Sequence, residues 1–143
     1  MTCVRNGAYW QLRLERGEDV PTEVAGFVLR HQIRSGLITG LGAADMVVLG
    51  HFSLRTKKYR KRKLAGEYEI AGILGNIAWD GKVPVCHMHA VVTGPDMKAL
   101  GGHLFAARVA ATCEISILPG ARRLGRKLDQ TTGLKLLALR SRG

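Results

Sequence analysis

Three of the five histidines in this chain lie close together, in the segment HMHAVVTGPDMKALGGH at residues 87–103. His87 and His89 form a His-x-His pair, and His103 directly follows a Gly-Gly pair. A neutral imidazole is the commonest side-chain ligand for metal ions in proteins. The spacing indicates either a three-histidine metal site or unrelated surface histidines, and spacing alone does not decide between them.

The first two histidines lie in a segment, residues 82–92, whose alternating pattern predicts a strand. Successive side chains of a strand point to opposite faces. The apolar face, predicted to meet the core, carries Cys86, Met88, Ala90 and Val92. His87 and His89 then project together from the other face, with Cβ atoms about 7 Å apart. Two imidazoles at this spacing can converge on one ion.

The partner strand of this segment is predicted at residues 67–79, because Asp-Gly at positions 80–81 is typical of a two-residue hairpin turn. Such a turn places Gly72 opposite His89, and it puts Asn76 on the histidine face. We expect Asn76 to contact a substrate or to support a metal ligand from the second shell of the site.

The third histidine is predicted near the start of a helix, because Gly101 and Gly102 permit close backbone approach and a tight entry into the helical run that follows. The exposed N–H groups of a helix N-terminus favour anionic ligands. Three histidines leave coordination positions open for water or a substrate, which suits a divalent metal: zinc, with nickel or iron as alternatives.

A second feature is the run RTKKYRKRK at residues 55–63, in which seven of nine residues are basic. We expect an exposed loop or hairpin tip there, and a second basic cluster, RRLGRK, follows at residues 122–127. Both clusters are typical of polyanion binding, although a solvated hairpin tip is the alternative. The candidate nucleic-acid-binding residues are Arg55, Lys57, Lys58, Tyr59, Arg60, Lys61, Arg62, Lys63, Arg122, Arg123, Arg126 and Lys127.

The composition supports a polyanion partner, because the 143 residues carry a formal net charge of +11. The length is that of one domain, and we expect residues 1–143 to form it. Three cysteines without C-x-x-C spacing argue against a disulfide framework. No apolar run approaches the roughly 20 residues that cross a bilayer, so we expect a cytoplasmic protein without membrane association.

The remaining patterns predict the elements that position these residues. Residues 9–15 alternate as a strand, and Asp19 precedes a helical pattern that begins at Val20. Further strands are expected at residues 46–54 and at the CEISIL segment, and LKLLAL closes the domain. The resulting expectation is an α+β fold, with helices packed on one face of a mainly antiparallel sheet.

Several of these segments together resemble the plant and prokaryote conserved (PPC) domain, which in plants accompanies AT-hook motifs. They are RLERGEDV, SGLITGLGAAD, KKY, GEYEIAGILGNIAWDGKVPVCHMH, GGHL, ATCEISI and TGLKLL, and they span about residues 8–139. The resemblance implies an α+β domain that assembles into a trimer, and it implies that His87, His89 and His103 can hold a metal ion. The chain has no Arg-Gly-Arg-Pro core, so a DNA function rests on its charge.

Two functional hypotheses follow. The first is a homotrimeric protein that binds DNA or another polyanion, without sequence specificity or by shape, through the basic loop and that carries a three-histidine metal site. The alternative is a metal-dependent enzyme or small-molecule binder, in which the ion would acidify a bound water. The sequence identifies no general base, so it leaves open whether the protein is an enzyme. A third interpretation is a metal-stabilised scaffold that does no chemistry.

Overall fold

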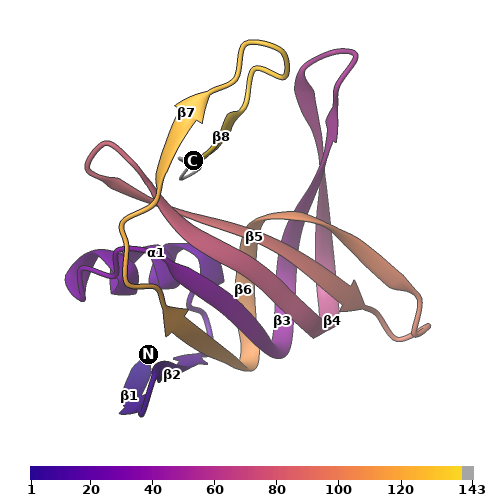
Figure 1. Ribbon diagram of the computed structural model, residues 1–143. Coiled ribbons are helices and arrows are strands. Elements are labelled where there is room, and N and C mark those ends of the chain that lie inside the picture. Colours follow the sequence, from indigo (N-terminus) through magenta and orange to yellow (C-terminus); the bar gives the residue numbers. More distant parts are fainter. Residues whose placement is uncertain (140–143) are drawn as a thin grey trace.

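The computed structural model describes residues 1–139, which form eight strands and one helix (Figure 1). In chain order the elements are β1 (Thr2–Asn6), β2 (Tyr9–Glu15), α1 (Val20–Arg30), β3 (Gly36–Ser53), β4 (Lys58–Asp80), β5 (Val83–Thr93), β6 (Ala99–Pro119), β7 (Gly125–Leu128) and β8 (Lys135–Ala138). None of these residues form a helix long and apolar enough to cross a bilayer.

All eight strands belong to one sheet, in which β3, β4, β5 and β6 form a closed ring of paired strands. The ring closes because β5 pairs with β4 along one edge and with β6 along the other, while β3 pairs with both β4 and β6. Every strand pairing is antiparallel except that of β4 with β7. The sheet is therefore mainly antiparallel, as expected.

The predicted α+β fold with helices packed on one face is wrong, because α1 is the only helix within residues 1–139. The segment expected to form the second helix lies inside β6. Its alanines favour a helix locally, but β6 pairs with β2, β3 and β5 along its length. Ala107 and Val109 are buried on either side of exposed Arg108, which is the two-residue period of a strand. Pairing of this segment with β3, and of the flanking parts of β6 with β5 and β2, overrides the local helix propensity.

The helix α1 begins as the sequence predicts, and it covers part of the sheet at β5 and β6 (Figure 1). The carboxylate of Asp19 accepts a hydrogen bond from the backbone N–H of Thr22, so it caps the helix. Its other oxygen accepts from the backbone N–H of Ala107 in β6, at 3.0 Å. The buried side chains of α1 are Val20, Val24, Phe27 and Val28. Asp19 therefore starts the helix and also ties it to the sheet.

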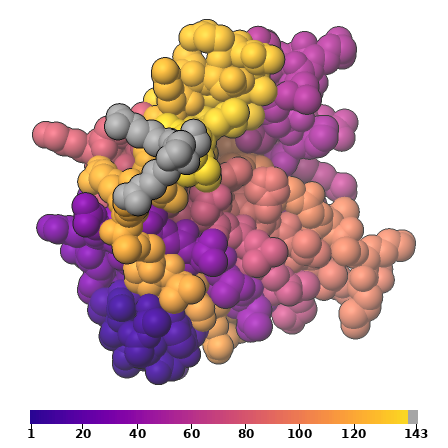
Figure 2. Space-filling view, in the orientation of Figure 1, coloured from indigo at the N-terminus to yellow at the C-terminus, as the bar shows by residue number. Residues whose placement is uncertain are grey.

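Two hairpins project from the same end of the ring, one formed by β3 and β4 and the other by β7 and β8 (Figure 1). The ammonium group of Lys57, in the first hairpin, donates a hydrogen bond to the carbonyl of Gln130 in the second. Their surfaces are in contact at the top of the space-filling view (Figure 2). The β3–β4 hairpin carries the basic run, and its turn occupies the residues between Ser53 and Lys58.

Candidate metal centre

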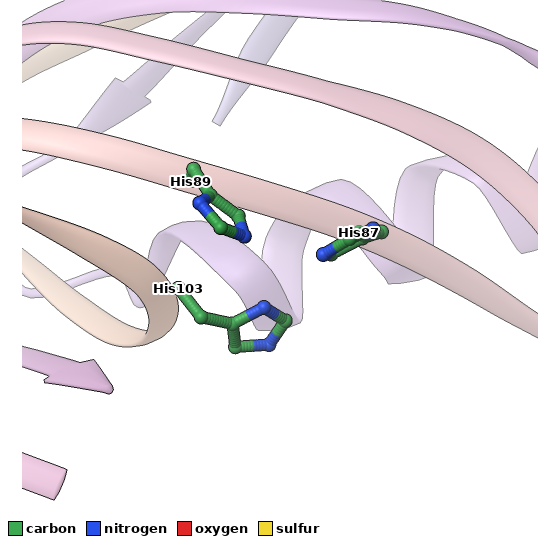
Figure 3. A group of neighbouring side chains, drawn as sticks. All are labelled: His87, His89 and His103. Carbon is green, nitrogen blue, oxygen red and sulfur yellow. The ribbon is translucent and has the colours of Figure 1, made fainter. Parts of the chain in front are cut away.

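The three histidines converge on the outer face of the strand ring, with their rings turned toward one another (Figure 3). His87 and His89 come from β5 and His103 comes from β6, and the ring centroids lie 5.1–5.4 Å apart. One nitrogen from each ring lies within 4.8 Å of the others. Among residues 1–139 this is the only cluster of three or more histidine, cysteine or acidic side chains close enough to hold one ion.

Strand alternation positions the first two ligands as the sequence predicts. Met88 and Ala90 are buried in the core, whereas His87 is half-buried and His89 is exposed on the opposite face. The predicted register is wrong by two residues, because Asp80 pairs with Val83 and the turn falls at positions 81–82.

The observed register changes the cross-strand partners of these two histidines in β4. Leu74, not Gly72, lies opposite His89, and Asn76 lies opposite His87. Asn76 therefore lies on the histidine face, as predicted, in the position directly across the β4–β5 ladder from a candidate ligand.

The prediction that His103 lies at a helix N-terminus is wrong, because His103 is a strand residue that pairs directly with His89. The preceding Gly102 allows β6 to approach β3 closely. A Cβ atom at Gly102 would lie 2.8 Å from the carbonyl oxygen of Gly50, inside any normal contact distance. Gly102 therefore serves close strand packing beside the site, and the Gly-Gly pair does not lead into a helix.

The surroundings keep two of the histidines neutral at physiological pH. Burial, together with the nearby His87, His89, Arg126 and Lys61, lowers the pKa of His103 to about 4. Burial also lowers the pKa of His87, as do Arg126 and His89. A neutral imidazole is the form that binds a metal, so both side chains are ready to ligate without first losing a proton.

The site passes a direct test of fit to a metal ion, because Nδ1 of His103 is buried and has no hydrogen-bond partner. Buried polar atoms nearly always have one, so this nitrogen requires a ligand that the protein does not supply. In a tetrahedral zinc site the ligand nitrogens lie about 3.3 Å apart. Three nitrogens within 4.8 Å reach that separation by small side-chain rotations. The donor set therefore fits zinc or a similar divalent metal.

Two aromatic side chains, Tyr59 of β4 and Phe105 of β6, pack against the imidazole of His103. The Phe105 ring lies 4.7 Å from it and the Tyr59 ring lies 5.2 Å from it, between ring centroids. The ammonium group of Lys61 lies 3.9 Å from the centroid of Phe105. Tyr59 is half-buried in this packing. Its predicted contact with a nucleic acid stays a prediction, and in the structure its ring packs against that of His103.

Arg126 is a residue of this site that the sequence did not assign to it. It lies in β7, and its Nη2 donates a hydrogen bond to Oδ1 of Asn76 at 3.0 Å, while its Nη1 donates to the carbonyl of Lys135. Its charge lowers the pKa of both His87 and His103. No local sequence pattern predicts this contact, because Arg126 reaches β4 only when the β7–β8 hairpin is folded against it.

The remaining basic residues are distributed over both hairpins. The basic side chains between Lys58 and Lys63 point alternately to the two faces of β4, and Arg55 and Lys57 lie in the turn before it. In the second cluster, the Arg123 guanidinium stacks 4.1 Å over the ring of Trp79 and donates a hydrogen bond to the carbonyl of Gly81. Arg122 and Lys127 are exposed. The structure thus brings Arg126 to the histidines and leaves most of the other basic groups on the surface.

The fold and the site define a class of protein: a single mainly antiparallel sheet with a three-histidine, metal-capable site on its outer face. The chain belongs to the Plants and Prokaryotes Conserved (PCC) domain family, whose sequence model matches residues 1–119. This is the family that the sequence motifs resemble. No curated protein matches the chain closely enough to count as a relative.

Solved structures similar to this chain cover nearly all of it. A metal-containing protein from Archaeoglobus fulgidus is 34% identical, with 91% of this chain and 92% of that chain covered and a TM-score of 0.85. A protein from Bacteroides thetaiotaomicron, provisionally described as DNA-binding, is 25% identical, with 95% of each chain covered and a TM-score of 0.92. A plant- and prokaryote-conserved protein from Pyrococcus horikoshii is 24% identical, with 98% of this chain and 95% of that chain covered. Its TM-score of 0.85 shows that it shares the fold.

Proposed function

We propose that this chain is a metal-binding protein whose histidine cluster, His87, His89 and His103, holds one divalent ion. The observation that carries the proposal is the buried, unpartnered Nδ1 of His103 within a group of three converging imidazoles. The similar metal-containing protein from Archaeoglobus fulgidus supports it. Zinc suits three nitrogen ligands best, and nickel and iron are the alternatives. When bound, the ion supplies a Lewis-acid centre.

Metal analysis of protein purified without a histidine tag tests this proposal directly. We expect about one ion per chain in the wild type, the usual stoichiometry for one three-histidine centre. His87→Ala and His103→Ala should each remove most of it, because two imidazoles bind far more weakly than three. His51→Ala is the matched control, since His51 is an exposed strand histidine outside the cluster. Equal metal content in the wild type and the two cluster variants would refute the site.

A second proposed function is binding of DNA or another polyanion through the basic run. The run is exposed along the β3–β4 hairpin, and the net charge of +11 favours association with phosphates. The similar protein from Bacteroides thetaiotaomicron, provisionally described as DNA-binding, points to the same partner. The hairpin places seven basic side chains within nine positions, which is more than solubility requires.

Salt titrations with short duplex DNA and RNA test this second function. A triple substitution of Lys58, Arg60 and Arg62 to glutamine should lower the slope of log affinity against log salt by about 2.7, because each phosphate contact contributes about 0.9. The matched control replaces Arg5, Arg13 and Arg16, three exposed arginines at the N-terminal end. Equal slopes for the two triple variants would exclude the hairpin as the binding surface.

The same chain is proposed to assemble into a homotrimer, as the family resemblance implies. An apolar patch on the outer face of the ring supports the assembly: Leu37, Leu41, Leu74 and Leu118 are 63%, 57%, 71% and 46% exposed. Such a patch on a small domain usually marks an interface. Light scattering of Leu41→Asp should report a monomer, whereas Leu54→Asp, at the hairpin tip, should leave the trimer intact. A monomeric wild type would refute the assembly.

An enzymatic or small-molecule-binding role of the metal centre is the alternative to the polyanion function. The histidine cluster contains no aspartate or glutamate within residues 1–139. The cationic side chains next to the histidines, Arg126 and Lys61, then bear on which ligand the centre would accept.

A further inference from the structure

The region around the histidine cluster contains an excess of positive charge. Two cationic side chains lie beside it: Arg126, which is hydrogen-bonded to the cross-strand partner of His87, and Lys61, which lies over the Phe105 ring next to His103. The three histidine ligands are neutral when they bind a metal, so they do not offset the two charges of a divalent ion. The centre therefore has the charge of the ion and two cationic side chains to balance.

The guanidinium of Arg126 has hydrogen-bonding capacity that the protein leaves unused. Arginine carries five N–H donors. One is used by Oδ1 of Asn76 and one by the carbonyl of Lys135. The buried Nε has no partner. Leaving a buried charged donor unsatisfied is costly, so an acceptor is expected there in the working state of the protein.

Two unsatisfied groups thus occur in one region of the molecule. Nδ1 of His103 and Nε of Arg126 are the only buried side-chain nitrogen or oxygen atoms without a hydrogen-bond partner in residues 1–139. Nδ1 of His103 needs a Lewis acid or a hydrogen-bond donor, and Nε–H of Arg126 needs a hydrogen-bond acceptor. Asn76 connects Arg126 to the histidine cluster, because it is the cross-strand partner of His87 and the hydrogen-bond partner of Arg126.

We propose that Arg126 is an anion-binding residue of the metal centre, and that the centre takes a small molecule with a terminal oxyanion, a carboxylate or a phosphate. The shared chemistry is a pair of anionic oxygens, which a guanidinium binds through two parallel N–H bonds. The inference rests on the proposed metal function and names the class of ligand that this function serves. Asn76 positions Arg126 by holding its Nη2.

Anion titrations of the cobalt-loaded and the metal-free protein test the inference. Cobalt(II) gives visible absorption bands that change when its ligands change, and calorimetry gives the anion affinity in both forms. Acetate and inorganic phosphate are the probes in separate arms. We expect Arg126→Gln to weaken binding of the preferred anion by about tenfold or more, the loss typical of a hydrogen bond to a charged group. The anion affinity of Arg126→Lys should lie between that of the wild type and that of Arg126→Gln.

The control variants separate anion binding from folding. Lys127→Gln removes a neighbouring, exposed cation of β7, and it should leave anion affinity unchanged. Asn76→Ala removes the support but keeps the guanidinium, so it should weaken binding less than Arg126→Gln does. Circular dichroism checks that each variant keeps the strand content of the wild type.

The two proposals fail in different ways. Absence of cobalt bands in the wild type would refute the metal function. Equal anion affinities of the wild type and Arg126→Gln, in both the cobalt-loaded and metal-free forms, would overturn the role of Arg126, as would no binding of either anion. Preference for acetate or for phosphate identifies which of the two oxyanions the centre takes, and either one supports the inference.

Discussion

His89 of β5 and His103 of β6 are direct cross-strand partners, with ring centroids 5.4 Å apart. The antiparallel ladder between the two strands fixes this relationship, so the separation of the two imidazoles depends on backbone pairing and not on a flexible loop. His87 reaches the same point because it lies two residues from His89 on the same face of β5. The metal centre is therefore organised by the sheet before any ion binds.

The first prediction concerns the close approach of β6 to β3. A methyl group at Gly102 would lie 2.8 Å from the backbone oxygen of Gly50, and a backbone atom cannot rotate away. We expect Gly102→Ala to shift β6, to destabilise the fold by about 1–3 kcal/mol and to lower metal affinity through displacement of His103. Denaturant unfolding and metal titration measure the two effects.

The neighbouring glycine provides the control for this substitution. At Gly101 an added methyl would meet the carbonyl oxygen of Ala90 at 3.4 Å, an ordinary contact distance. Gly101→Ala should therefore leave metal affinity close to that of the wild type. Similar losses of affinity in the two variants would show that tight packing at Gly102 does not position the histidine.

A second prediction is that the metal-free protein loses stability as the pH falls through the histidine range. The pKa of His103 is about 4 in the folded chain, against an unfolded value of about 6.5. Between these values the unfolded state binds a proton that the folded state does not. The free energy of unfolding should therefore decrease as the pH falls below about 6.5, and the effect should be complete near pH 4.

Denaturant unfolding of chelator-treated protein between about pH 7.5 and about pH 4.5 measures this dependence above the range in which most carboxylates titrate. His103→Gln removes the titrating group and should flatten the curve in this window. His87 has a lowered pKa as well and should leave a smaller residual slope. Identical curves for the wild type and His103→Gln would contradict the prediction.

A third prediction concerns the contact between α1 and the sheet. Asp19 accepts hydrogen bonds from the N–H groups of Thr22 and Ala107. Asp19→Ala should destabilise the fold by about 1–3 kcal/mol, because it removes a helix cap and leaves the N–H of Ala107 without its acceptor. Asp19→Asn retains one side-chain oxygen and should have a smaller effect. Thermal unfolding of both variants tests this order, and the reverse order would refute it.

A fourth prediction concerns the buried indole of Trp79. Its Nε1–H donates to the carbonyl of Ile33 at 3.0 Å. Trp79→Phe should destabilise the chain by about 1–3 kcal/mol, because the ring remains apolar but the carbonyl loses its donor. It should also weaken the stacking of Arg123, so proteolysis within β7 and β8 should become faster. An unchanged free energy of unfolding would show that water replaces the indole donor.

The histidine face could be predicted from the sequence because strand alternation is a local property. The apolar identities of Met88 and Ala90 are sufficient to place His87 and His89 on the opposite face, and the structure confirms this placement. Asn76 was placed correctly for the same reason, since a register error of two residues preserves the face. The helix cap at Asp19 could also be predicted from the sequence, because it depends on residues close together in the chain.

The failed predictions depend on contacts between distant segments. The alanine-rich part of β6 has the local preference of a helix, and only its pairing with β3, within a strand that β5 and β2 extend on either side, makes it extended. The turn at positions 81–82, in place of 80–81, follows from the longer pairing of β4 with β5. Arg126 lies 50 residues after Asn76 in the chain, so no spacing rule could bring the two together.

The β7–β8 hairpin joins the rest of the sheet through one parallel residue pair, Trp79 with Gly125. The family match ends at residue 119, so this hairpin, with Arg126, lies outside the matched segment. Substitutions in the hairpin leave the hydrogen-bond ladders of the strand ring untouched. A change at Arg126 would therefore alter the group proposed to meet the ligand while the strand ring continues to hold the three histidines in place.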